Sequence, residues 1–487
     1  MIKIPAKYLI LFTYFCFLFI SNVYAQDNLK KGIDAVNRGD YVSALNLLKD
    51  VVKKDNGYDA NYYYGEALFR TGSIDEAEKY LNIALKDDDE GILALKDLGE
   101  IYTQKKDYDK ANSYFKTALK VEPQNITVLI SQAAMYSAQG KIDDAIQVLT
   151  LATTFSKNNP AIYVGLGDAW FARGTTPKLA IDYYQRALKI KPNLAVAYYG
   201  LGKVYFKQKK YNESVNAFNT AIEKDPNFAA AYLEKGKILY FDQDYSQAAR
   251  VFTKYSQLKP GSQEGNSYYA KTLYAEGKFD DALALLTDVL KNDPKSITGN
   301  LYTAYILAEQ EQTDSLKQIE NYNKAIEYFK KVSVDDMDPD DLLKFANVYV
   351  NVKNFDDAAP LYQRTIKMDS SNSDAYYAYG KMFFKMEKYD DALNYFLLAE
   401  NYGMKKQSCY IYAGLTDFYI KKYEDAISQF QEILKLDDKN TFAYTWIGKC
   451  YFVLGKNDDA VKSYEQILTY DPQNAETLDV LKKIKKQ

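Results

Sequence analysis

The stretch AVAYYGLGKVYFKQKKYNESVNAFNTAIEKDPNF, residues 195–228, decides the fold of this 487-residue chain. It contains two amphipathic segments joined by a short polar turn. In the first segment Tyr198, Leu201 and Tyr205 recur at helical spacing and form one apolar stripe. In the second segment apolar residues lie at 217–218 and 221–222, and Pro226 prevents the helix from continuing. The stretch therefore predicts a pair of packed helices.

The same two-segment pattern recurs along the chain with a period close to 34 residues. Each copy has an Ala as its anchor, usually with a Gly twelve positions earlier and a bulky apolar residue four positions later. A single pair of helices cannot bury its apolar stripe, whereas stacked pairs share one continuous core. The chain is therefore predicted to be one stack of thirteen units rather than several globular domains. The anchors are Ala44, Ala77, Ala111, Ala145, Ala180, Ser214, Ala248, Ala282, Ala325, Ala358, Ala392, Ala426 and Ala460.

This pattern resembles the tetratricopeptide repeat family, which has a 34-residue period and a signature of a small residue, Ala, Phe and Pro. The resemblance covers residues 26–472, although Ser214 replaces one anchor Ala and several repeats lack the Pro. It implies an all-α fold, a right-handed α-solenoid of about thirteen helix-turn-helix repeats. In the family the first helix of each repeat lines a concave groove that binds other proteins, and the same is expected here.

The first 25 residues have the order of a secretory signal peptide. Lys3 and Lys7 precede an apolar run over residues 8–20, and Ala25 ends a candidate cleavage site before Gln26. The run is short for a membrane-spanning helix, which needs roughly 20 residues. We expect cleavage, export to the periplasm or outer envelope, and no integral membrane span in the mature chain. An uncleaved N-terminal anchor is the alternative.

Two further segments depart from the plain repeat. The interval between Ala282 and Ala325 is nine residues longer than the period, and the extra residues fall around 309–317. We expect both helices of that repeat to lengthen into a projecting helical hairpin, with a simple loop insertion as the alternative. Residues 473–487 are expected to form a C-terminal capping helix, with Leu478, Leu481 and Ile484 on one face.

The composition excludes several functions. Lys and Arg number 62 and Asp and Glu 65, so the chain lacks the basic surplus of a general nucleic-acid binder. The absence of His removes His-dependent nucleophiles and metal sites. Cys409 and Cys450 would be offset by roughly 10 Å along neighbouring helices, too far for a disulfide, and are predicted to be buried unpaired thiols. We predict a protein without catalytic residues, metal or cofactor.

The resemblance to tetratricopeptide repeats also places the candidate binding residues. Groove positions lie eighteen, fifteen, eleven, eight and seven residues before each anchor, and Lys203, Lys237 and Lys271 recur there at the repeat period. Some family members bind a C-terminal carboxylate through Asn and Lys at such positions. Only Asn347 fits that pattern here, which disfavours recruitment of heat-shock chaperones. The candidate groove residues are Tyr199, Lys203, Phe206, Lys207, Lys237, Tyr240, Phe241, Lys271, Tyr274, Tyr305, Tyr377, Lys381, Phe384, Lys385, Lys449 and Phe452.

Two interpretations of these residues remain open. Tyrosine offers rigid contact area with a hydrogen-bonding tip, and lysine attracts carboxylates, so the groove suits an extended acidic or aromatic-rich segment. Alternatively, the aromatic rings pack between neighbouring helices and the lysines only solvate them.

The expected function is a non-enzymatic scaffold that binds other envelope proteins, in secretion or envelope assembly. This expectation comes from the family resemblance together with the predicted signal peptide. An accessory role in polysaccharide export is the alternative, because aromatic grooves also suit sugars.

Overall fold

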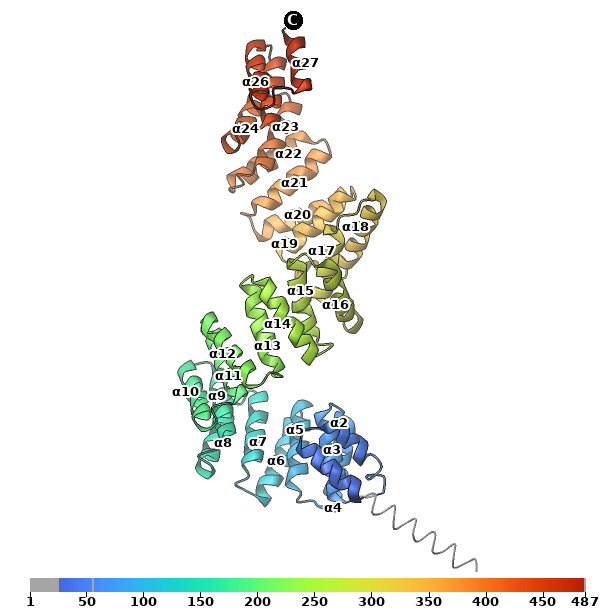
Figure 1. Ribbon diagram of the computed structural model, residues 1–487, viewed down its shortest axis with the longest axis vertical. Coiled ribbons are helices and arrows are strands. Elements are labelled where there is room, and N and C mark those ends of the chain that lie inside the picture. The colour runs from blue at the N-terminus through green and yellow to red at the C-terminus, as the bar shows by residue number, and fades with distance from the viewer. Residues whose placement is uncertain (1–25, 55–56, 486–487) are drawn as a thin grey trace, which may run out of the picture. The chain divides into compact units, whose positions relative to one another are not determined.

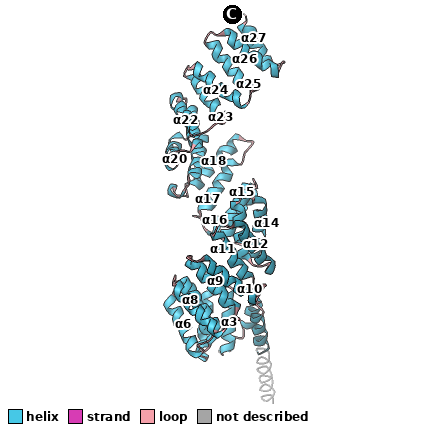
Figure 2. Cartoon of the chain, turned by 90° about the vertical axis from the view of Figure 1, so that its left-hand side faces the viewer, coloured by secondary structure: helices cyan, strands magenta, loops and turns pink. Residues whose placement is uncertain are grey.

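The computed structural model describes residues 26–54 and 57–485, and this part of the chain is helical with no β-strand (Figure 2). The predicted signal peptide lies outside the described residues. Within them, no helix is both long and apolar enough to cross a membrane. The described residues divide into two compact units, one up to Ile238 and the other from Leu239, and each is considered by itself below.

Helices alternate as the first and second members of successive repeats, which confirms the predicted all-α repeat fold (Figure 1). The first helices are residues 26–37, α3 (Tyr58–Arg70), α5 (Ile92–Gln104), α7 (Ile126–Ala138), α9 (Pro160–Arg173), α11 (Ala195–Lys207), α13 (Ala229–Phe241), α15 (Gln263–Ala275), α17 (Ile297–Glu309), α19 (Pro339–Asn351), α21 (Ser373–Lys385), α23 (Gln407–Tyr419) and α25 (Thr441–Val453). The second helices are α2 (Tyr41–Leu48), α4 (Ile74–Asp87), α6 (Tyr108–Val121), α8 (Ile142–Phe155), α10 (Pro177–Ile190), α12 (Tyr211–Lys224), α14 (Tyr245–Leu258), α16 (Phe279–Asn292), α18 (Ser315–Phe329), α20 (Phe355–Met368), α22 (Tyr389–Asn401), α24 (Tyr423–Leu436) and α26 (Asn457–Tyr470).

The small residue of the first helix and the bulky residue of the second helix form one packing unit. A Cβ atom added to Gly202 in α11 would lie 2.5 Å from the ring of Phe218 in α12, closer than carbon atoms approach. Phe218 is 1% exposed, and Ser214, the anchor residue of this repeat, is fully buried. The Gly therefore admits the aromatic ring, and the two helices pack closely because of it.

The turn within a repeat places one residue in the left-handed backbone region. Gly39 has φ 77° at this point and Lys209 has φ 61°, each five positions before its anchor. This conformation costs an L-residue roughly 1–2 kcal/mol, and Gly avoids the cost. The turn is therefore imposed by the packing of the two helices even where the local residue disfavours it.

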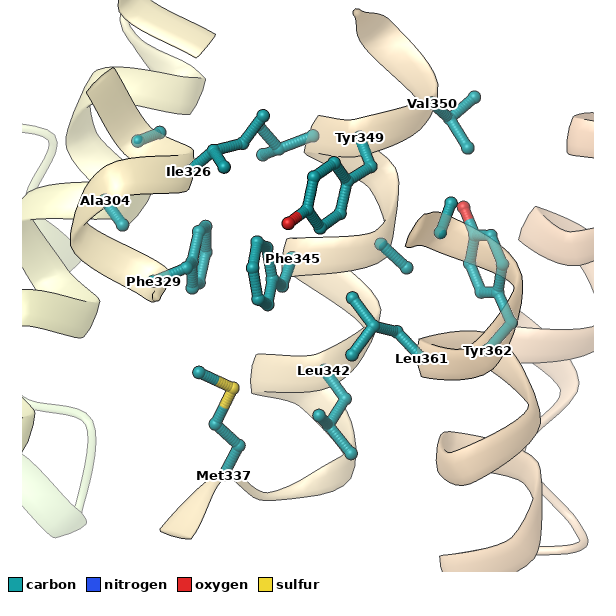
Figure 3. Packing of buried hydrophobic residues seen from close by; sticks show 14 of the residues in the cluster. Ala304, Ile326, Phe329, Met337, Leu342, Phe345, Tyr349, Val350, Leu361 and Tyr362 are labelled. Atoms are coloured by element: carbon teal, nitrogen blue, oxygen red, sulfur yellow. The ribbon is translucent and has the colours of Figure 1, made fainter. Parts of the chain in front are cut away.

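The longest stretch of core in the second unit runs from α17 to α21. Phe329 of α18 stacks on Phe345 of α19 with ring centroids 4.5 Å apart, and Tyr349 continues the stack at 4.8 Å (Figure 3). Leu342 and Tyr362 are fully buried beside them. This packing fixes the position of α19, which carries half of the candidate site described below.

The lengthened repeat differs from the expected hairpin. The first helix, α17, keeps 13 residues and ends at Glu309, and residues 310–314 are not helical. Only the second helix begins early, at Ser315, and it also ends early, at Phe329. A short 3₁₀ helix, η1 (Val334–Asp336), then leads into α19. Only the second helix therefore takes up part of the insertion, and the rest forms a loop.

The C-terminal helix packs as a cap on the last repeat. α27 (Ala475–Ile484) buries Leu481 and Ile484 against α26, whereas Leu478 remains 38% exposed. The Nζ of Lys485 lies 3.0 Å from Oε1 of Glu465 in α26. The cap therefore uses two of its three predicted apolar contacts.

Candidate functional site

Within each unit the first helices form the inner layer of the stack. Successive first helices pack against each other, as α5 does on α7 and α19 on α21. The second helices do not pack directly on one another to a comparable extent. A ligand that contacts several repeats at once is therefore best placed against the first helices.

A charged cluster that the sequence analysis missed lies on α3 and α5. Lys96 Nζ lies 2.6 Å from Oδ1 of the fully buried Asp97, and Arg70 Nη1 lies 3.5 Å from Oε2 of Glu100. Burial raises the pKa of Asp97 to about 6, although Lys96 opposes the shift. Because Arg70 of α3 pairs with Asp97 and Glu100 of α5, the cluster holds these adjacent first helices together.

In repeat six the two predicted groove lysines lie over the same aromatic ring. The Nζ atoms of Lys203 and Lys207 lie 5.4 and 5.2 Å from the ring centroid of Phe171 in α9. Lys203 also lies 3.4 Å from Oδ1 of Asp168. The structure therefore brings these two lysines together, but part of the charge of Lys203 is neutralised within the chain.

The other predicted residues of the first unit have different environments. Tyr199 packs against Phe218, with ring centroids 5.6 Å apart, whereas Phe206 is 42% exposed. Lys237 Nζ lies 3.1 Å from Oε1 of Glu234 on the same helix. Tyr199 therefore contributes to packing, and Phe206 is the residue of this set that faces solvent.

In the second unit, Lys271 lies between aromatic rings rather than in open solvent. Its Nζ lies 5.5 Å from the ring centroid of Tyr268 and 5.4 Å from that of Tyr302, and burial lowers its pKa. The hydroxyl of Tyr240 lies 3.4 Å from that of Tyr302, and Phe241 is 64% exposed. Lys271 is thus part of the packing between first helices.

The predicted groove residues Tyr274 and Tyr305 are both engaged by neighbouring helices. The ammonium group of Lys344 donates to the Tyr274 hydroxyl and to Oε1 of Glu309, each at 2.7 Å. Burial raises the pKa of Tyr274 to about 12. Tyr305 is 5% exposed and donates a hydrogen bond to Asp341. These tyrosines join α15, α17 and α19.

A pocket of about 530 Å³ lies on α19, α20 and α21 and includes three predicted residues, Tyr377, Lys381 and Lys385. Lys381 Nζ lies 5.5 Å from the ring centroid of Tyr377. Burial lowers the pKa of Lys385, and the charges of Lys381 and Lys353 add to the effect. Phe384 packs instead on Tyr412, with ring centroids 5.3 Å apart. The remaining lining residues are Asp340, Leu343, Asn347, Val350, Asn351, Tyr362, Asn372, Asp374 and Ala378.

The sequence contained the signal for the missed half of this pocket. The five groove offsets applied to the anchor Ala358 give Asp340, Leu343, Asn347, Val350 and Asn351, and all five line the pocket. The sequence analysis named the groove residues of the repeats on either side but only Asn347 in this one. The pocket thus combines equivalent positions of two adjacent first helices.

The last predicted positions lie outside this pocket. Lys449 Nζ lies 4.4 Å from the ring centroid of Trp446, and Phe452 is 38% exposed. Cys409 and Cys450 are buried and unpaired, which confirms that prediction. Burial raises the pKa of both thiols to about 12, so neither is a reactive thiolate at neutral pH.

The fold and its inner layer define an all-helical repeat solenoid, a class of protein that presents one extended face to partners. Its units are tetratricopeptide repeats. Models of that repeat match residues 29–92, 72–126, 102–163, 242–301 and 421–484, and a further repeat model matches 178–209 and 202–241. A model described as anaphase-promoting complex, cyclosome, subunit 3 matches residues 318–399 and 351–433. No curated protein matches the chain.

Several solved structures are similar in fold at low sequence identity. The Cut9–Hcn1 hetero-tetramer of the APC/C is 14% identical at a TM-score of 0.40, covering 93% of this chain and 95% of that chain. Yeast Tom70 is 16% identical at a TM-score of 0.32, covering 82% of this chain and 97% of that chain. The human IFIT1 dimer with m7Gppp-AAAA is 17% identical at a TM-score of 0.36, covering 82% of this chain and 95% of that chain.

Proposed function

We propose that this protein is a non-enzymatic scaffold that binds an extended segment of a partner protein against its inner helices, with the pocket on α19–α21 as the principal site. The observation that carries the proposal is this pocket, in which equivalent residues of two neighbouring repeats face one space. Amides, ammonium groups and carboxylates line it together with Tyr377 and Leu343. This mixture matches the backbone and side chains of a polypeptide.

The proposed location is the bacterial cell envelope. Its support is the sequence of residues 1–25, whose basic start, apolar run and small-residue end have the order of a signal peptide. Intact mass spectrometry of the protein from its native host tests this point. A mature chain that begins at Gln26 is expected, and a chain that retains residues 1–25 would instead indicate a membrane-anchored scaffold.

A capture experiment with matched charge reversals tests the binding function. The bait carries Lys381→Glu with Lys385→Glu, and the control carries Lys435→Glu with Lys462→Glu, which reverses two exposed lysines on the second helices. Envelope proteins bound by wild type and by the control should be absent from the first variant, because reversed charges across an interface cost several kcal/mol. Equal capture by all three proteins would refute the site.

A polysaccharide is the competing ligand. Retention of purified envelope polysaccharide by wild type, lost in the Lys381→Glu, Lys385→Glu variant while protein capture stays unchanged, would replace the protein-binding proposal with polysaccharide binding.

A further inference from the structure

The pocket on α19–α21 has unlike charge at its two ends. At the start of the two first helices, Asp340 and Asp374 occupy equivalent positions. At the C-terminal ends of the same two helices, Asn351 and Lys385 occupy equivalent positions. Tyr377 of α21 and the equivalent residue of α19, Leu343, lie between the two ends. The pocket therefore runs along the helix axes from carboxylates, past an apolar centre, to hydrogen-bond donors.

Buried structure fixes the donor end. The hydroxyl of the fully buried Tyr362 donates to Oδ1 of Asn347 at 2.7 Å. This bond occupies the amide oxygen, so the NH₂ group of Asn347 is the part left to bind a ligand. The Nζ of Lys381 lies over the rings of Tyr377 and Tyr412 at 5.5 and 5.3 Å, and Lys381 lines the same pocket as Asn347. The end is a set of donors that suits a carboxylate.

Positive charge is concentrated at the donor end. The pKa of Lys385 is lowered by burial and by the nearby Lys381 and Lys353. A bound carboxylate would relieve this repulsion.

The acidic end can accept a cation. Asp374 pairs with Lys406 at 3.1 Å, but both side chains are more than half exposed, so the pair contributes little and can be exchanged. Asp340 is the second residue of α19 and is also exposed. A lysine or arginine side chain that enters from solvent can therefore be neutralised here by two carboxylates from neighbouring repeats.

Helix geometry sets the distance between the two ends. Asp374 and Lys381 are seven residues apart, and Asp374 and Lys385 eleven, which at 1.5 Å per residue gives roughly 10 and 16 Å along α21. An extended polypeptide advances roughly 3.3 Å per residue. The charges of a matching ligand are therefore about three to five residues apart.

We infer that the pocket, if it serves the scaffold function proposed above, selects an internal segment of a partner protein with an acidic side chain three to five residues from a basic one. The segment lies extended along α19 and α21. Its carboxylate binds Asn347, Lys381 and Lys385, and its cation binds Asp340 and Asp374. Charge complementarity at both ends identifies the occupant, because a purely acidic or purely basic segment would meet like charge at one end.

A selection from a random eight-residue library, displayed with flanking linkers at both ends, tests the inference on the whole chain. Wild type should enrich segments with one acidic and one basic residue three to five positions apart. The variant Lys381→Glu, Lys385→Glu should enrich segments that are basic at both positions. The variant Asp340→Lys, Asp374→Lys should enrich segments that are acidic at both. Enrichment of acid-only segments by wild type, or the same segments from all three proteins, would overturn the inference.

Two further arms separate the possible failures. Ala378 lines the pocket, and Ala378→Trp fills it; circular dichroism confirms that the variant keeps its helices. If wild type enriches nothing beyond this blocked variant, the proposed peptide-binding function fails along with the inference. The best selected segment is then synthesised with a free and with an amidated C-terminus. Equal affinity is expected, and a requirement for the free carboxylate would replace the internal segment with a chain end.

The same synthetic peptide gives the size of the effect. Reversing Lys381 and Lys385 should weaken its binding at least about tenfold, since it places like charges against each other across the interface. Fluorescence anisotropy with the labelled peptide measures the change.

Discussion

Replacing Asp417 with Leu should stabilise the protein, and more so at high pH than at low pH. Asp417 lies near the end of α23 at 2% exposure. It stands nine positions before its anchor, where other repeats place buried apolar residues such as Leu68 and Leu273. Its Oδ1 atom accepts no hydrogen bond from the described residues. A carboxylate therefore occupies a position that the repeat normally fills with an apolar side chain.

Burial is the main cause of the shifted titration of Asp417. It raises the pKa from 3.8 to about 7; the carboxylates of Asp425 and Glu400 add to the rise, and the ammonium group of Lys422 opposes it. The folded protein therefore keeps a proton that the unfolded chain releases. Stability falls as the pH rises from about 4 to about 7 and is then constant with respect to this group.

The magnitude follows from the two pKa values. The difference between 3.8 and about 7, at roughly 1.4 kcal/mol per pKa unit, gives a penalty of roughly 4 kcal/mol above pH 7. At pH 5 only roughly 1–2 kcal/mol of it is present, because Asp417 is mostly protonated in the folded state. The advantage of Asp417→Leu over wild type should therefore grow by roughly 2–3 kcal/mol between pH 5 and pH 8.

Hydrogen exchange is the suitable assay, because a stack of repeats opens locally rather than as one unit. Opening free energies of α23 and α24 are measured by mass spectrometry for wild type and variant at pH 5, 6, 7 and 8, after correction for intrinsic exchange rates. The difference between the two proteins isolates Asp417 from other titrating groups. Asp417→Asn is the matched control. Its stability should lose the pH dependence caused by Asp417, but it should not show the increase in stability that Asp417→Leu shows at pH 5.

Two results would refute this reasoning. One is an advantage of Asp417→Leu that stays the same from pH 5 to pH 8, which would mean that Asp417 ionises normally. The other is a destabilised Leu variant at pH 8, which would mean that the carboxylate makes a necessary contact.

Three other substitutions test the fold and the groove. Lys209→Gly should stabilise the protein by roughly 1 kcal/mol, because Gly tolerates the positive φ at this turn; an unchanged urea midpoint would contradict this. Gly202→Val should destabilise it by roughly 1–3 kcal/mol, because a side chain there overlaps the ring of Phe218, and thermal unfolding followed by circular dichroism measures the loss. Lys203→Glu with Lys237→Glu should leave helix content unchanged while partner capture at low salt falls; unchanged capture would assign both lysines to the solvated surface.

The sequence by itself determined the repeat and its packing rule. The recurrence of Gly, Ala and a bulky residue at fixed offsets reports which residues face the partner helix, because side-chain direction in a helix depends only on position along it. This is why the helical pairs and the two buried thiols could be predicted, whereas the contact of Gly202 with the ring of Phe218 came only from the structure. The groove offsets implied by the family resemblance include the five pocket residues of α19, although only Asn347 among them was named from the sequence.

Only the tertiary structure decided which groove residues remain available to a partner. Lys203 and Lys271 occupy equivalent positions, yet one pairs with Asp168 and the other lies between tyrosine rings. The hydroxyl of Tyr305 already donates a hydrogen bond to Asp341, whereas Tyr377 lines an open pocket. Periodicity assigns a residue to a face, but its partner is chosen by the side chains of the neighbouring repeats, which vary from one repeat to the next.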